Sequence, residues 1–213
     1  MQILHLDSSI LTTDSGSREL TASVVAALRR ERPGSSILYR DLTVEPIAHL
    51  DGAIASGFRP IGVKESSASV QTEHARSEAL VAEFLASQLI VIGAPMYNFA
   101  VPTQLKAWID RIVQPGRTFK YAETGPVGLA GDKQVIVAST RGGVYTGGPL
   151  AGLDFQEPYL KAVFGFMGVT KLQFVRAERM SKGPDARSES MAAAHQSISS
   201  IVSQALISQA LAV

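Results

Sequence analysis

Short apolar runs alternate with stretches of helical spacing along most of the chain. This alternation predicts βαβ units around a parallel sheet. A parallel strand that is buried on both faces forms a continuous apolar run, as Leu89 to Ile92 does. The five predicted strands are Gln2 to Leu6, Ser36 to Asp41, Leu89 to Ile92, Val135 to Ala138 and Lys171 to Val175.

Apolar residues between these strands recur with the spacing of amphipathic helices. Predicted helices begin at Ser17, about Ser69, Pro102, Pro158 and Asp185, and they end at Pro33-Gly34, at Ala86, after Ile112, at Phe166 and near Leu211. The apolar stripe of the third predicted helix includes Trp108. This side chain could face the core or a partner helix, and we expect the core. Leu42 to Ser66 is irregular, and a small hairpin or lid is expected near residues 119–131.

These elements predict one domain over residues 1–213, with a doubly wound, five-stranded parallel sheet and helices on both faces. A chain of 213 residues suits one such domain. Ligands of doubly wound sheets bind at the carboxyl ends of the strands. The loops that follow the strands are therefore the places to look for a site.

Charge and composition narrow the function classes. Twenty Lys and Arg against nineteen Asp and Glu give a net charge of +1 without a basic run, so we expect no nucleic-acid partner. No apolar run approaches the roughly 18 residues of a membrane span. The short apolar run at the amino terminus has no basic region before it, so we expect a first strand there and not a signal peptide. The chain has no Cys, which excludes disulfides and cysteine nucleophiles. We expect a cytoplasmic protein without a membrane partner.

Three strand-exit loops carry candidate chemistry. Ser9 and Ser15-Gly16-Ser17 precede a helix, where free N–H groups bind phosphate, although such serines are also ordinary helix caps. Met96-Tyr97-Asn98-Phe99 follows the central strand and could form an apolar flavin wall or simply cap the core. Thr140-Arg141-Gly142-Gly143 lets the backbone approach a ligand closely, or is a flexible turn.

Several signatures are missing. The sequence has no GxGxxG after the first strand, no GxxxxGK[ST] and no GxSxG, so it predicts neither a dinucleotide fingerprint, a P-loop nor a hydrolase elbow. Its four histidines form no HxH or HExxH pair, and we expect no metal site.

Together these pieces resemble the FMN-dependent NADH:quinone oxidoreductases, also called FMN-dependent azoreductases. The resemblance covers nearly the whole chain and keeps the family order. It rests on Ser8-Ser9-Ile10-Leu11, Ser15-Gly16-Ser17, Ala94-Pro95-Met96-Tyr97-Asn98-Phe99, Thr103-Gln104-Leu105-Lys106, Phe119-Lys120-Tyr121, Gly125-Pro126-Val127-Gly128-Leu129, Ser139-Thr140-Arg141-Gly142-Gly143, Pro158-Tyr159-Leu160 and Gly165-Phe166.

The resemblance implies a flavodoxin-like fold and a homodimer with one FMN per subunit near the dimer interface. It implies reduction of FMN by NADH or NADPH, followed by two-electron reduction of quinones and reductive cleavage of azo compounds in a ping-pong mechanism. No catalytic side chain is expected, because the chemistry belongs to FMN. The implied FMN ligands are Ser9, Ser15, Gly16, Ser17, Met96, Tyr97, Asn98, Phe99, Thr140, Arg141, Gly142 and Gly143, and the implied substrate-pocket residues are Tyr121 and Phe166.

The chain also departs from the family pattern. Gly16 stands where the family often has Gln, so a side-chain contact near the phosphate is lost, and the segment from Val144 to Glu157 is longer than usual. Two alternatives stay open: a flavodoxin-type electron carrier without its own substrate, and a cofactor-free regulatory domain. The choice between NADH and NADPH also stays open.

Overall fold

Five parallel strands form the central sheet in the order β2-β1-β3-β6-β7, which confirms the predicted fold class. They are β1 (Gln2–Asp7), β2 (Ser36–Asp41), β3 (Leu89–Pro95), β6 (Gln134–Thr140) and β7 (Lys171–Ala177). The structure, a computed structural model, describes residues 1–61 and 67–210. β3 and β6 are buried along their full length, as the central strands of a sheet covered on both faces must be.

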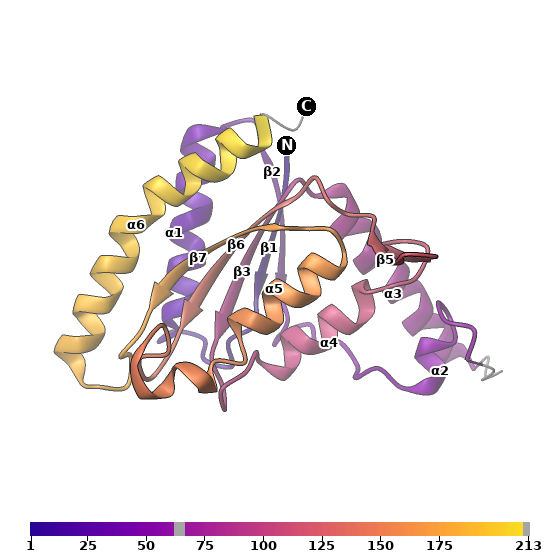
Figure 1. The fold of residues 1–213 in the computed structure, drawn as a ribbon, viewed down its shortest axis with the longest axis horizontal. Helices are drawn as coiled ribbons and strands as arrows, with labels where there is room; N and C mark the ends of the chain where they lie inside the picture. The colour runs from indigo at the N-terminus through magenta and orange to yellow at the C-terminus, as the bar shows by residue number, and fades with distance from the viewer. Residues whose placement is uncertain (62–66, 211–213) are drawn as a thin grey trace.

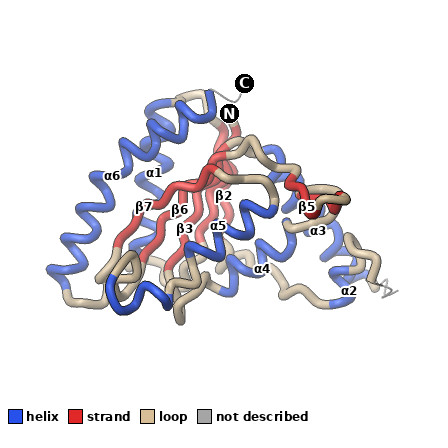
Figure 2. The backbone as a smooth tube through the Cα atoms, viewed as in Figure 1, coloured by secondary structure: helices blue, strands red, loops and turns tan. Residues whose placement is uncertain are grey.

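Helices cover both faces of this sheet (Figures 1 and 2). One face carries α1 (Gly16–Glu31) and α6 (Pro184–Ala210). The other carries α3 (Ala68–Ala86), α4 (Thr103–Ile112) and α5 (Glu157–Phe166). Alternate strand residues supply the two cores: Ile3 packs toward α1 and α6, whereas Leu4 and Leu6 pack on the opposite face.

Trp108 of α4 faces the core, as expected from the sequence. The side chain is fully buried, and its ring meets Phe84 edge-on with 6.0 Å between centroids. The apolar stripe of α4 is therefore used within the chain, between the sheet and α3. The opposite side of α4 is left to face outward.

Four strands continue past the ends that their apolar runs predicted, β1 by one residue and β3, β6 and β7 by two or three. β3 continues through Gly93-Ala94-Pro95, and Pro95 pairs with Thr140 of β6, which in turn pairs with Ala177 of β7. Gly, Ala and Pro have low strand propensity, so pairing decides their conformation here: Gly93 pairs with both β1 and β6, whereas Ala94 and Pro95 pair with β6 alone. The extension carries three strand ends to one common edge, next to the loops that were singled out.

Smaller elements lie outside the central sheet. The segment from Leu42 to Ser66 contains the short helix α2 (Gly52–Ala55), which was not expected. Residues 62–66 of this segment lie outside the described residues, and so does Leu211 of the last predicted helix. β4 (Phe119–Ala122) and β5 (Gly125–Gly128) form an antiparallel hairpin in the segment where a hairpin or lid was expected. A 3-10 turn, η1 (Gly148–Leu153), lies between β6 and α5.

Candidate functional site

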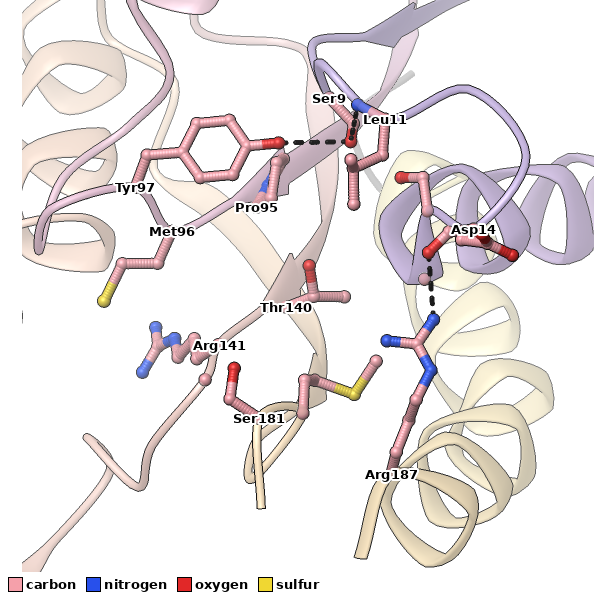
Figure 3. A pocket seen from close by; sticks show the side chains of 14 residues that line it. Ser9, Leu11, Asp14, Pro95, Met96, Tyr97, Thr140, Arg141, Ser181 and Arg187 are labelled. Carbon is pink, nitrogen blue, oxygen red and sulfur yellow. Dashed lines mark hydrogen bonds between the residues drawn. The ribbon is translucent and has the colours of Figure 1, made fainter. Parts of the chain in front are cut away.

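The carboxyl ends of β1 and β3 lie at the topological switch point of the sheet. The chain continues to β2 on one side of this point and to β6 on the other, an arrangement that leaves a crevice between the departing loops. A cavity of about 170 Å³ lies in this crevice (Figure 3). It is lined by Ser9, Leu11, Asp14, Ser15, Gly16, Pro95, Met96, Tyr97, Thr140, Arg141, Gly142, Met180, Ser181 and Arg187.

Hydroxyl groups and a helix start line the β1 side of the cavity. Ser15 is the N-cap of α1, and its Oγ accepts from the Arg18 N–H at 3.4 Å and lies 3.2 Å from the Ser17 Oγ. The first N–H groups of the helix have no carbonyl partner within it. Together with the helix dipole, these donors make the start of α1 suited to an anion.

Arg18 holds this loop in place from within α1. Its guanidinium donates to the backbone carbonyls of Ser9 and Leu11, both at 2.9 Å. It also pairs with both oxygens of Asp41, at 2.6 and 2.9 Å. Arg18, which the sequence pattern did not single out, therefore helps to hold the loop in its conformation.

The Arg18–Asp41 pair shifts the titration of both groups. Hydrogen bonding to Asp41 raises the pKa of Arg18, although partial burial opposes the shift. Hydrogen bonding from Arg18 holds the pKa of the Asp41 carboxyl far below its usual range. Neighbouring Tyr39 has its pKa raised to about 12, by burial first and by the nearby carboxylates second. The pair is thus charged throughout the physiological range.

A tight turn follows β3 and carries the second group of predicted residues. Tyr97 and Ala100 exchange backbone hydrogen bonds of 3.1 Å in both directions, which leaves Asn98 and Phe99 as the two central residues. Both have positive φ, 48° and 71°, as a type I′ turn requires. Asn tolerates this region, but for Phe it is strained. Such strain is characteristic of functional sites.

The geometry of the turn also leaves polar groups available. The Tyr97 hydroxyl lies 3.3 Å from the Ser9 Oγ and joins this turn to the β1 loop. Within residues 1–61 and 67–210, the N–H groups of Asn98 and Phe99 have no hydrogen-bond partner. Phe99 is 42% exposed, although it is large and apolar. The turn therefore offers donors and an apolar surface side by side.

Arg141, after β6, is buried in a cluster of carboxylates. Its guanidinium pairs with Glu157 and lies 3.1 Å from Asp154 and 3.4 Å from Glu178. Its Nε donates to the Ser139 Oγ at 3.0 Å. The Arg141 charge is thus neutralised within the chain, although Arg141 and Gly142 both line the cavity.

Glu178 joins the same cluster to the long segment after β6. It accepts hydrogen bonds from the N–H groups of Tyr145 and Thr146, at 2.6 and 3.0 Å, and from the Thr146 hydroxyl. Burial raises the pKa of the Glu178 carboxyl, but these hydrogen bonds outweigh burial and leave the pKa below the usual value. The base of the segment is therefore held by an ionised carboxylate at neutral pH.

The structure brings the three predicted loops together around one cavity. Eight of the predicted FMN ligands line it: Ser9, Ser15, Gly16, Met96, Tyr97, Thr140, Arg141 and Gly142. Ser17, Asn98, Phe99 and Gly143 belong to the same loops but do not line it. The role of all twelve as cofactor ligands stays a prediction.

Tyr121 and Phe166 lie elsewhere in the chain. Both pack on Phe119, with ring centroids 5.3 and 4.5 Å apart respectively. This aromatic cluster lies at the β4–β5 hairpin and the carboxyl end of α5, and the hairpin is far from the start of α6 (Figure 1). Within one chain, neither ring lines the cavity.

Six lining residues were not predicted. Pro95 directly precedes Met96, Leu11 lies two residues after Ser9, and Asp14 precedes the N-cap of α1. Met180 and Ser181 lie in the loop after β7, and Arg187 lies in the first turns of α6. The rule that ligands bind at the carboxyl ends of strands applies to the β7 loop as well and could have indicated Met180 and Ser181. No local pattern indicated Arg187.

Comparison with known proteins places this site in a family context. The family model described as "Flavodoxin-like fold" matches residues 1–202. A protein of Ralstonia nicotianae named FMN-dependent NADH:quinone oxidoreductase is 64% identical over 206 residues, which cover 97% of this chain and 99% of that protein. A protein of Xanthomonas euvesicatoria pv. vesicatoria named FMN-dependent NADH:quinone oxidoreductase 2 is 61% identical and covers 95% and 94%.

Solved structures of azoreductases have the same fold as this chain. The azoreductase AzrA superposes with a TM-score of 0.87 at 27% identity, over 96% of this chain and 100% of that one. An azoreductase from Bacillus anthracis str. Sterne superposes with a TM-score of 0.86 at 26% identity, over 96% and 99%.

Residues 1–61 and 67–210 contain no cluster of three or more His, Cys, Asp and Glu side chains able to hold a metal ion. None of the helices described is both long and apolar enough to cross a membrane.

Proposed function

The chain belongs to the flavodoxin-like-fold family, among its FMN-dependent NADH:quinone oxidoreductases, and from this membership we propose that it reduces quinones and azo compounds with NADH through a bound FMN. The observation that carries the proposal is the convergence of three strand-exit loops on one cavity at the switch point of the sheet. Doubly wound sheets bind flavins and nucleotides at this place.

The cavity fits the phosphate end of FMN. Ser9 and Ser15 offer hydroxyls, and the start of α1 offers N–H groups. Gly16 keeps the approach open, because a Cβ there would come within 2.8 Å of the Met180 methyl group. The cavity has a volume of about 170 Å³, which is below the roughly 300 Å³ of the smallest typical small-molecule sites. The ring would therefore extend beyond the rim.

The strained turn after β3 is placed to receive that ring. The Asn98 and Phe99 N–H groups would donate to its polar edge, and Met96 and Tyr97 would form an apolar wall beside it. The backbone from Thr140 to Gly143 would line the pyrimidine side. N–H donors fixed in advance stabilise negative charge on a bound ligand without reorganisation.

FMN, when bound, would accept a hydride from the nicotinamide and pass two electrons to the second substrate. The chain's part would be to hold the flavin and to leave one open face for both substrates in turn. Because nicotinamide and quinone would share this face, we propose a ping-pong mechanism. No acid–base side chain is needed for this role.

We also propose that the protein works as a homodimer. Tyr121 and Phe166 do not line the cavity of their own chain, so a second subunit would supply the aromatic side chains that flank the substrate. An apolar groove between α4 and α5 is a suitable surface for that subunit, with a volume of about 610 Å³. It is lined by Ala100, Val101, Thr103, Lys106, Phe155, Pro158, Tyr159 and Ala162.

The groove adjoins the flavin turn directly. Phe155, which lines the groove and is 57% exposed, donates its backbone N–H to the Phe99 carbonyl at 3.1 Å. Exposed aromatic side chains in a continuous apolar patch are typical of protein interfaces. A partner seated in the groove would therefore reach the proposed ring site.

The function is tested with the purified full chain. We expect it to carry yellow flavin that is released as FMN, to be bleached by NADH, and to oxidise NADH continuously when a quinone is added. Double-reciprocal plots at several quinone concentrations should give parallel lines. A flavin that NADH bleaches but quinone does not reoxidise would favour an electron carrier, and a colourless protein that binds no added FMN would rule out both.

A further inference from the structure

Arg187 is the residue in the cavity whose charge the proposed function does not yet use. A flavin phosphate carries close to two negative charges at neutral pH. Three charged residues line the cavity: Asp14, Arg141 and Arg187. Which of these charges reaches the phosphate decides how the site distinguishes phosphorylated flavins from others.

Arg141 is not available for this task. Its side chain is fully buried, and Asp154, Glu157 and Glu178 surround the guanidinium. Its positive charge is thus offset by three carboxylates before any ligand binds. Figure 3 shows its guanidinium turned away from Asp14 and the start of α1.

Asp14 opposes an anion only weakly. It is exposed to solvent, which screens its carboxylate, and it lies directly before the N-cap Ser15. The helix dipole and the hydroxyls at this point act in the opposite sense. A positive side chain nearby would settle the balance in favour of a phosphate.

Arg187 lies where such a side chain is needed. It projects from the first turns of α6 across the mouth of the cavity to the loop before α1 (Figure 3). One Nη2 hydrogen bond of 3.0 Å to the Asp14 carbonyl holds it there. In the described part of the chain this carbonyl is the only partner of the guanidinium, which has five N–H donors.

We propose that Arg187 binds the phosphate of FMN and makes the site selective for FMN over riboflavin, which has the same ring but no phosphate. This proposal rests on the proposed function. Arg pairs with phosphate through two parallel N–H donors, which gives both strength and geometry. Arg187 reaches the phosphate from α6, opposite the donors of α1, and the phosphate is held between two helices.

The test compares the two flavins on the full chain after flavin removal, by quenching of flavin fluorescence. Arg187→Gln keeps a donor for the Asp14 carbonyl but removes the charge. We expect it to raise the FMN Kd by roughly tenfold to a hundredfold, the range for a lost hydrogen bond to a charged group. The riboflavin Kd should change less than about twofold by the same reasoning. Arg187→Lys should fall in between.

Arg179→Gln is the matched control. Arg179 lies in the same loop region but pairs with the exposed Glu189, at 3.3 Å, and does not line the cavity. It should leave both Kd values unchanged. Equal changes for the two flavins in Arg187→Gln, or no change for FMN, would overturn the proposal while the proposed function stands. Failure of the unaltered chain to bind either flavin would overturn both.

Discussion

Arg18 and Asp41 show how one ion pair can shape a ligand loop without touching the ligand. The guanidinium contacts both carboxylate oxygens and two loop carbonyls at once. An isolated surface pair contributes less than about 1 kcal/mol. Here both side chains are at least 85% buried, and the hydrogen bonds to charge are shared across four acceptors. The pair should therefore stabilise the fold more than a surface pair does.

Asp41→Asn should show this by its dependence on pH. Because Arg18 depresses the pKa of Asp41 in the folded state, the ionised carboxyl stabilises the fold above its usual pKa of 3.8. We expect the variant to lose about 1.5–3 kcal/mol of unfolding free energy at neutral pH. This difference should shrink as pH falls below 3.8, since the unaltered carboxyl is then protonated on unfolding.

Urea unfolding over a series of pH values measures both quantities. Thr43→Ala offers a comparison, since Thr43 donates to the same carboxylate without bringing a charge. If the Asp41→Asn difference persisted undiminished into the acid range, packing and not charge would be its cause.

Individual site residues could be predicted only where a residue type suited to ligand binding occurred in a loop at the end of a predicted strand. Ser9 and Ser15 stood out because hydroxyls before a helix bind anions or cap the helix, and both line the cavity. Arg18 and Arg187 did not, because a lone Arg on a helix carries no local pattern. Their roles depend on partners such as Asp41 and Asp14, which the fold brings close from distant parts of the chain.

At the scale of elements, the β4–β5 hairpin is held by a very close backbone approach. A Cβ on Gly128 would lie 2.0 Å from the Gly168 nitrogen and 2.2 Å from the Met167 carbonyl carbon. These are backbone atoms and cannot swing aside as a side chain would. Glycine is required here so that β5 can rest on the end of α5.

Gly128→Ala should therefore displace the hairpin. We expect a loss of about 1–3 kcal/mol of unfolding free energy, as for other overpacked sites. Gly152→Ala is the control, because a Cβ there meets nothing within 4 Å and should be nearly neutral. Thermal and urea unfolding of both variants give the comparison, and equal stability of the two would show that the backbone at Gly128 can yield.

Elements were predictable in proportion to their apolar periodicity. The long helices and the five strands were located from it. The ends of β3, β6 and β7 were missed, because their last residues pair across the sheet without an apolar signal. The short helices α2 and η1 were missed because so few residues show no periodicity.

At the scale of the whole molecule, the alternation of strands and helices predicted a parallel sheet covered on both faces, whereas the order of its strands and the pairing of subunits could not be predicted from this alternation. The apolar groove between α4 and α5 is assembled from residues that are far apart in sequence, such as Val101 and Ala162. Its exposed apolar side chains are not distinguishable from core residues in the sequence. The proposed homodimer therefore needs its own test.

Ala162→Glu places a charge in that groove. We expect it to convert a dimer into a monomer, because burying an unpaired carboxylate costs several kcal/mol. Light scattering after size exclusion measures the mass. Quinone reduction should fall with dimerisation if the partner supplies Tyr121 and Phe166. The same substitution at Ala193, exposed on α6, is the control and should change neither. A dimeric, fully active Ala162→Glu protein would place the interface elsewhere.

The segment between β6 and α5 is fixed at both ends and free in the middle. Arg141 and Glu178 hold its two ends, while the residues of η1, Gly148 to Leu153, are all exposed. Natural variation can therefore lengthen or shorten this tip without disturbing the flavin-side backbone. Among related chains, we expect preferences for different electron-accepting substrates to arise by insertions and deletions in this tip. The residues that anchor the segment should stay the same.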